Sequence, residues 1–118
     1  KIEKYFVFDM SVPELVVYRA ENINYFTRMS EYETEPVLLG DAAGIWMDEW
    51  ESAWISKDII NQFLYKNKIV AVISPEIHKR DEMVMWNFIR SIHSDRLLLC
   101  TDKPDLFAEF SSCSQHSI

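Results

Sequence analysis

The residues best suited to chemistry come directly after short apolar runs. Asp48 and Glu49 follow the apolar run 44–47. Carboxylate oxygens are the ligands that hard cations such as Mg²⁺ and Ca²⁺ prefer. Adjacent residues of a strand point to opposite faces, so both carboxylates reach one ion only if the strand has already ended. We expect Asp48 and Glu49 as the metal ligands of this chain.

A second group of polar residues follows the apolar run 69–73. It contains Glu76 and His78, two residues apart in a segment that begins with Ser74 and Pro75. A general acid or base needs a tuned pKa and a close polar neighbour, and Glu76 is the neighbour that the sequence offers to His78. These two residues are the candidate catalytic pair.

Five further side chains near these positions are candidates for contacts with a substrate. Arg28 could hold a phosphate in two parallel hydrogen bonds, or it could pair with the acidic residues that follow it, among them Glu31. Lys79 and Arg80 continue the segment of His78, and Trp50 follows the acidic pair. We expect Arg28, Glu31, Lys79, Arg80 and Trp50 as substrate-binding residues.

The elements that must position these residues alternate along the chain. The expected strands are residues 5–8, 23–29, 44–47, 69–73 and 97–100. The expected helices are residues 12–20, 56–67, 81–92 and 104–110, with a short helix near 37–39. Strands that alternate with helices predict an α/β fold with about five parallel strands and right-handed crossovers. Functional groups of such folds gather at the carboxyl ends of the strands.

The chain shows one domain, residues 1–110, and a polar tail, residues 111–118, which we expect to be frayed.

The strand-end residues also have a purely structural interpretation, because Ser, Asp and Thr after strands are the usual helix caps. A small flavodoxin-like regulatory domain, with Asp9 and Asp48 as strand-end acids, is a further alternative. The ending Thr101-Asp102-Lys103-Pro104 disfavours it.

Composition excludes several classes of function. The net charge of −7 disfavours a nucleic-acid partner, which needs a basic surface. No apolar run is long enough to span a membrane. Only two glycines are present, so no glycine-rich phosphate loop exists. Of the two cysteines, Cys100 ends an apolar run and is expected to be buried, and we interpret the context as reducing and cytoplasmic.

At its strand ends the sequence resembles the carboxyl-terminal half of the glycerophosphodiester phosphodiesterase family, whose members are phospholipase-C-like TIM barrels. The matching segments are residues 8–14, 25–31, 44–49, 74–80 and 101–105. The last of these is similar to the strand that closes the family's barrel. The resemblance implies a phosphoric diester hydrolase that uses two histidines and a bound Ca²⁺ or Mg²⁺.

The resemblance also implies that part of the site is missing. The family's His-Arg-Gly strand end, its acidic pair and its second histidine belong to the other half, and none of them occurs here. A full barrel needs about 250 residues. We expect these 118 residues to be inactive alone and to need missing upstream residues or a second copy. The alternative is a non-catalytic module that forms a homodimer through its exposed sheet edges.

Overall fold

The structure is a computed structural model and describes residues 6–116. Its helices, 3₁₀ helices and strands are, in chain order, α1 (Val12–Ala20), β1 (Phe26–Met29), η1 (Leu39–Asp41), β2 (Gly44–Met47), α2 (Lys57–Tyr65), β3 (Ile69–Ile73), η2 (Pro75–His78), α3 (Met83–Ile89), β4 (Leu97–Cys100) and α4 (Pro104–His116).

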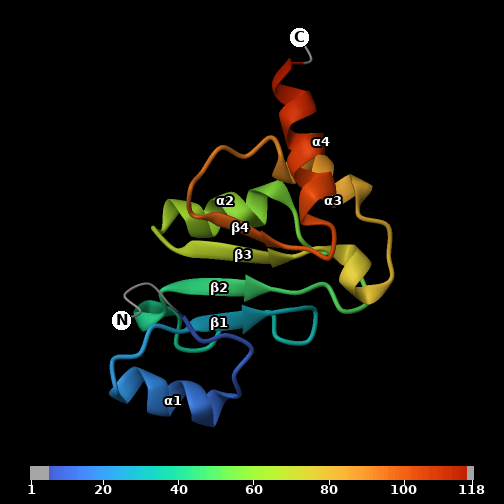
Figure 1. The fold of residues 1–118 in the computed structure, drawn as a ribbon. Coiled ribbons are helices and arrows are strands. Elements are labelled where there is room, and N and C mark those ends of the chain that lie inside the picture. Colours follow the sequence, from blue (N-terminus) through green and yellow to red (C-terminus); the bar gives the residue numbers. More distant parts are fainter. Residues whose placement is uncertain (1–5, 117–118) are drawn as a thin grey trace.

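The four strands form one parallel sheet in the order β1-β2-β3-β4 (Figure 1). This confirms the predicted α/β fold with parallel β/α units. The expected first strand, residues 5–8, is not a strand in its described part, residues 6–8. It contributes a single parallel bridge between Val7 and Tyr25. Residue 5 lies outside the described residues.

Strand β3 is the centre of the sheet because its residues suit burial on both faces. Val70 and Val72 are fully buried on one face, and Ala71 and Ile73 are almost fully buried on the other. An unbroken run of β-branched residues is typical of a strand covered on both sides. Neighbouring β2 begins with Gly44 because the carbonyl oxygen of Ile69 leaves no room for a Cβ atom there.

Local signals in the sequence set the starts of two helices. Helix α1 begins with a capping box, in which the Ser11 and Glu14 side chains each accept a hydrogen bond from the other's backbone N–H group. Helix α2 begins after Ser56, whose hydroxyl accepts from the N–H group of Ile59. Helix α3 is shorter than the predicted 81–92. None of the helices described within residues 6–116 is long and apolar enough to cross a membrane.

Helix α4 is longer than predicted. It continues to His116 and projects from the sheet beyond β4 (Figure 1). The segment 111–116, expected to be a frayed tail, is therefore helical, and residues 117–118 lie outside the described residues. Trp86 of α3 contacts the rings of Phe107 and Phe110, and the Arg90 guanidinium lies 4.0 Å above the Phe110 ring. These contacts hold the first part of α4 in a helical conformation. Its polar end extends this helix at little cost, because adding residues to an existing helix is easier than starting one.

The two faces of the sheet differ in how they are covered. Ile45, Met47, Val70 and Val72 point into the main core, which the helices complete. The alternate residues point to the opposite face, where Phe8 and Leu98 are 43% and 41% exposed. Cys100 lies on that face as well and is exposed, so the expectation that it is buried is wrong. Cys100 is exposed because it alternates onto this face, which is covered over β3 but only partly covered near Phe8 and Leu98.

Candidate functional site

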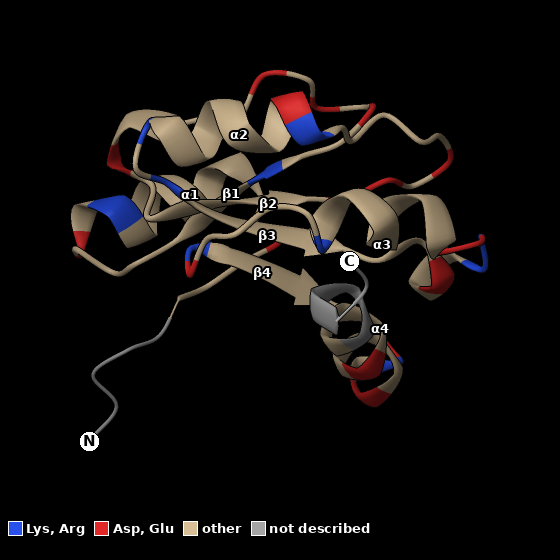
Figure 2. Ribbon diagram, turned by 90° about the horizontal axis from the view of Figure 1, so that it is seen from above, with Lys and Arg blue, Asp and Glu red and all other residues tan. Residues whose placement is uncertain are grey.

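The polar residues singled out in the sequence gather at one edge of the sheet. All four strands point the same way, and the loops that carry these residues leave the strands at their carboxyl ends (Figure 1). Arg28 is the only charged residue within the strands, and the other charges lie on helices and connections (Figure 2). A parallel sheet therefore brings residues far apart in sequence to a common edge.

At this edge of the sheet, the imidazole of His78 contacts the carboxylate of Asp48. The Nε2 atom of His78 lies 2.6 Å from Oδ1 of Asp48, and both side chains are largely buried. Asp48 continues the outward alternation of β2, and His78 ends the 3₁₀ helix η2 after β3. A carboxylate that accepts from Nε2–H leaves Nδ1 of the neutral ring as a proton acceptor. No other group in the described residues hydrogen-bonds this imidazole.

Trp50 contacts the imidazole, and Lys79 follows His78 in the chain. The centroid of the Trp50 ring lies 4.7 Å from that of His78, and the indole is 49% exposed. Lys79 follows His78 in the left-handed backbone conformation, with φ of 64°, and its side chain is exposed. Within the described residues the side chain of this lysine makes no hydrogen bond or ion pair. Trp50 therefore contacts His78 with about half of its surface exposed, and Lys79 adds an exposed cation at the next position of the chain.

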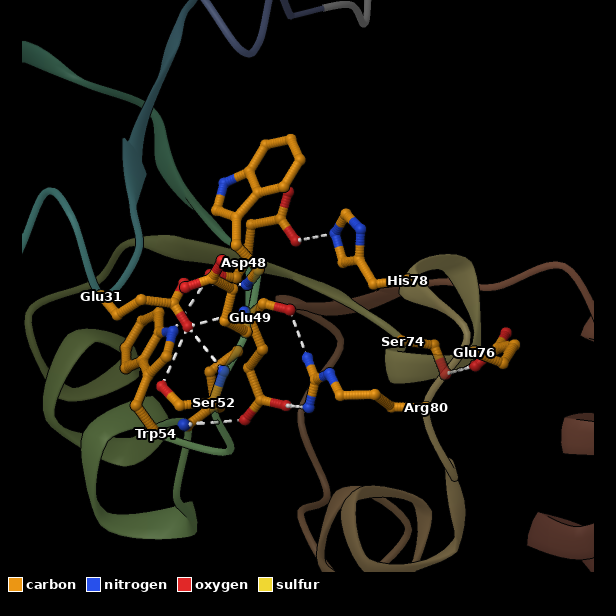
Figure 3. A network of polar contacts seen from close by, with 12 residues as sticks. Glu31, Asp48, Glu49, Ser52, Trp54, Ser74, Glu76, His78 and Arg80 are labelled. Carbon is orange, nitrogen blue, oxygen red and sulfur yellow. Dashed lines mark hydrogen bonds and ion pairs between the residues drawn. The ribbon is translucent and has the colours of Figure 1, made fainter.

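Asp48 and Glu49 point in opposite directions (Figure 3). Glu49 turns towards the start of α2, where it accepts a hydrogen bond of 2.9 Å from the N–H group of Ile55. Its second oxygen lies 3.3 Å from Nη1 of Arg80, whose Nη2 donates to the backbone carbonyl of Glu49. Burial raises the pKa of Glu49, although the hydrogen bonds from Ile55 and Arg80 oppose the rise. The guanidinium of Arg80 therefore pairs with a buried carboxylate of the protein itself.

A divalent cation does not fit the carboxylates of this edge by themselves. Asp48 and Glu49 diverge, as successive residues of an extended chain do. Among the residues that the structure describes, no three His, Cys, Asp or Glu side chains are grouped so that they could hold a metal ion. The expectation that Asp48 and Glu49 bind one ion therefore stays a prediction that would need further ligands.

Glu76 is placed away from His78 and joins two strand ends (Figure 3). Its carboxylate accepts from the hydroxyls of Ser74 and Thr101 and, at 3.0 Å, from the N–H group of Asp102. Burial raises the pKa of Glu76, but the hydrogen bonds from Ser74 and Thr101 lower it more, so the net shift is downward. Trp86 completes the group by donating its indole N–H to the Ser74 hydroxyl at 2.9 Å. Glu76 thus ties β3 to β4.

Glu31 holds the loop that follows β2. Its carboxylate accepts from the backbone N–H groups of Trp50, Glu51 and Ser52 at 2.7–2.9 Å, and from the Ser52 hydroxyl at 2.9 Å. Partial burial raises the pKa of Glu31, but these four hydrogen bonds outweigh it and lower the pKa to about 2. The carboxylate is therefore ionised and fully engaged within the protein.

Arg28 takes the ion-pair alternative. Its Nε lies 2.5 Å from a Glu33 oxygen, and its Nη1 lies 3.5 Å from an Asp9 oxygen. Two carboxylates beside one guanidinium satisfy its charge. Of the three cations predicted to contact a substrate, Arg28 and Arg80 are paired with acidic residues, and Lys79 is unpaired within the described residues.

Sequence reasoning missed the contact between Asp48 and His78 and the pair formed by Glu49 and Arg80. Part of this could have been predicted, because the alternation of side chains along β2 points Asp48 and Glu49 to opposite faces of the sheet. Which residue after β3 meets which carboxylate depends on the path of η2. No signal within a single stretch of sequence specifies that path.

Comparisons with protein-family models, with curated proteins and with solved structures gave no significant match to this chain.

Proposed function

We propose that this chain supplies part of the active site of a phosphoric diester hydrolase, with His78 as its proton-transfer residue and Asp48 as the group that holds it. The observation that carries the proposal is the 2.6 Å contact between Nε2 of His78 and Oδ1 of Asp48 at the carboxyl edge of a parallel sheet. This edge is where β/α folds place their chemistry. The resemblance of the strand ends to glycerophosphodiester phosphodiesterases suggests the substrate class.

The proton balance of diester hydrolysis gives His78 a defined task. The bond from phosphorus to the leaving alcohol breaks, and a new bond forms from the attacking oxygen. One proton leaves the attacking group, and one proton reaches the departing alcohol oxygen. His78 has a free Nδ1 atom and performs one of these transfers. Asp48 orients the ring and stabilises its cationic form. We propose that a group from the missing part of the barrel or from a second copy performs the second transfer.

Lys79 is the residue that we propose for attraction of the diester anion. It follows His78 directly, it is exposed, and no carboxylate of the described residues pairs with it. An ammonium group can approach a phosphoryl oxygen from several directions because it is a compact charge on a flexible stem. Arg28 and Arg80, in contrast, are engaged by Glu33 and Glu49.

The test is hydrolysis of glycerophosphoethanolamine by the protein expressed from its complete native reading frame. Product glycerol phosphate is followed by phosphorus NMR. We expect His78→Asn to lower the rate by about 100-fold or more, because general acid–base catalysis contributes that much. The matched control is His93→Asn, since His93 is exposed and lies before β4, at the opposite end of the sheet. Equal rates for the wild type and His78→Asn would contradict the proposal.

A second candidate function is assembly with a second copy of the chain. The sheet ends in β4 on one side and in the Val7 bridge on the other, and both edges run in the same direction. The β4 edge of one copy can therefore continue the parallel sheet of another. Phe8 and Leu98 expose apolar surface on the partly covered face, which such an assembly would bury.

Light scattering after size exclusion tests this assembly. We expect a mass near twice 14.0 kDa for the chain and a monomer for Leu98→Lys. The matched control is Val84→Lys, because Val84 on α3 is 74% exposed and lies outside the partly covered sheet face. A monomeric wild-type chain at high micromolar concentration would rule out the homodimer.

A further inference from the structure

The loop after β2 owes its shape to a single side chain from another strand end. Glu31 lies just beyond β1, and its two carboxylate oxygens receive all three N–H groups of residues 50–52. The pKa of about 2 keeps this carboxylate ionised at any neutral pH. Charge-assisted hydrogen bonds of this kind are about twice as strong as neutral ones. The loop is thus tied to β1 from a distance of about twenty residues in sequence.

The first of these three anchored residues, Trp50, also contacts the imidazole. The N–H group of Trp50 donates to Glu31 at 2.8 Å, and the indole lies with its centroid 4.7 Å from that of His78, at an interplanar angle of 37°. The indole is half exposed. Asp48 engages His78 through Nε2. The imidazole therefore contacts both a carboxylate and an aromatic ring.

We propose that Glu31 is a positioning residue for His78, which acts by fixing the backbone of Trp50 so that the indole confines the imidazole against Asp48. The proposal rests on the function proposed above only for its effect on catalysis. It also changes the role of Glu31, which the sequence predicts to bind substrate. Its carboxylate accepts four hydrogen bonds from residues 50–52 of the protein itself, and in this proposal it acts on a substrate only through Trp50 and His78.

The first experiment is NMR spectroscopy of the His78 ring protons in the full chain. An aromatic face at this distance shifts these resonances through its ring current. Trp50→Leu defines their position without the indole. We expect Glu31→Gln to move the His78 resonances towards that position and to accelerate amide exchange of residues 50–52 by about tenfold or more, because hydrogen bonds to a charged acceptor are about twice as strong as neutral ones.

Two further variants keep this test decisive. Glu35→Gln removes the same charge from an exposed position in the neighbouring connection and is expected to leave the His78 resonances unchanged. Ser52→Ala removes only the hydroxyl that donates to Glu31, and we expect it to shift the His78 resonances in the same direction by a smaller amount. This variant takes the place of Glu31→Gln if Glu31→Gln does not fold. Wild-type His78 resonances in Glu31→Gln, or in a folded Ser52→Ala when Glu31→Gln cannot be obtained, would overturn the proposal.

Kinetics separate this proposal from the proposed function. Glu31→Gln is expected to lower kcat for diester hydrolysis by about tenfold with little change in KM, and to have no further effect in the His78→Asn background. If the wild type does not hydrolyse diesters, the proposed function fails while the NMR result still decides the positioning role. If hydrolysis occurs and Glu31→Gln lowers the His78→Asn rate as much as the wild-type rate, Glu31 does not act through His78.

Discussion

Asp48 and His78 stand thirty residues apart in the chain, and the Nε2 and Oδ1 atoms of their side chains lie 2.6 Å apart at the carboxyl edge of the sheet. Asp48 extends the outward-facing row of β2, and His78 ends the single turn that follows β3. The pairing of adjacent parallel strands β2 and β3 brings the two positions together. This contact is the geometric basis for the proton-transfer role that we propose for His78.

The contact leads to a prediction for Asp48→Asn. The amide keeps the shape of the carboxylate but removes the charge that stabilises a protonated imidazole. We expect kcat for diester hydrolysis to fall by about tenfold or more with little loss of folding stability. Steady-state kinetics and urea unfolding measure the two effects. An unchanged kcat would mean that the carboxylate does not support His78 in catalysis.

Arg80→Gln is expected to destabilise the fold by about 2–3 kcal/mol at pH 7, because it leaves the buried Glu49 carboxylate without its cation. Burial already raises the pKa of Glu49, and loss of Arg80 raises it further. A raised carboxyl pKa means that the folded state binds the proton more tightly. The variant should therefore lose stability as pH rises from the ordinary value of 4.5 through the raised pKa.

Urea unfolding across pH measures this loss of stability in Arg80→Gln, with the exposed Arg19→Gln as control. Identical pH profiles for Arg80→Gln and the wild type would contradict it.

Glu76→Gln tests the tie between β3 and β4. Burial raises the pKa of Glu76, but hydrogen bonds from Ser74 and Thr101 lower it below 4.5 overall. The ionised group stabilises the fold above pH 4.5, and this contribution disappears as pH falls through the lowered pKa. We expect the variant to lose about 1 kcal/mol at pH 7 and to show a shallower decline in acid.

Thermal unfolding between pH 2 and pH 7 measures the effect of Glu76→Gln. Glu109→Gln serves as the control, because Glu109 is exposed on α4. A Glu76→Gln profile that runs parallel to that of the wild type would show that the carboxylate charge does not hold the two strand ends.

Gly44→Ala is expected to destabilise the sheet by about 3 kcal/mol or more, since overpacking a filled interior forces backbone shifts. An added Cβ atom would lie 2.4 Å from the carbonyl oxygen of Ile69 and 2.7 Å from the ring of Phe26. Gly40→Ala is the matched control, because a Cβ atom there meets nothing within 4 Å. Urea unfolding compares the two variants. Equal stabilities would show that β2 can move away from Ile69 without cost.

The sequence by itself determined the succession of elements and the edge at which the polar residues gather. Runs of β-branched residues such as 69–73 are typical of buried strands, and Ser11 and Ser56 mark helix starts through hydrogen bonds within three residues. These features depend on local interactions, so they can be predicted from the chain alone. The same local signals misjudged residues 111–116, because the helix there continues from aromatic contacts made by distant residues.

Only the tertiary structure decided which side chains meet. Sequence proximity suggested that Glu76 would assist His78, but a 3₁₀ helix turns by about 120° per residue, so residues two apart diverge. Asp48 takes that place instead, and Glu76 turns to Thr101. Such pairs are fixed by the register of β2, β3 and β4 and by the directions in which the chain leaves them. Both are set by the packing of the whole sheet, which no short stretch of sequence contains.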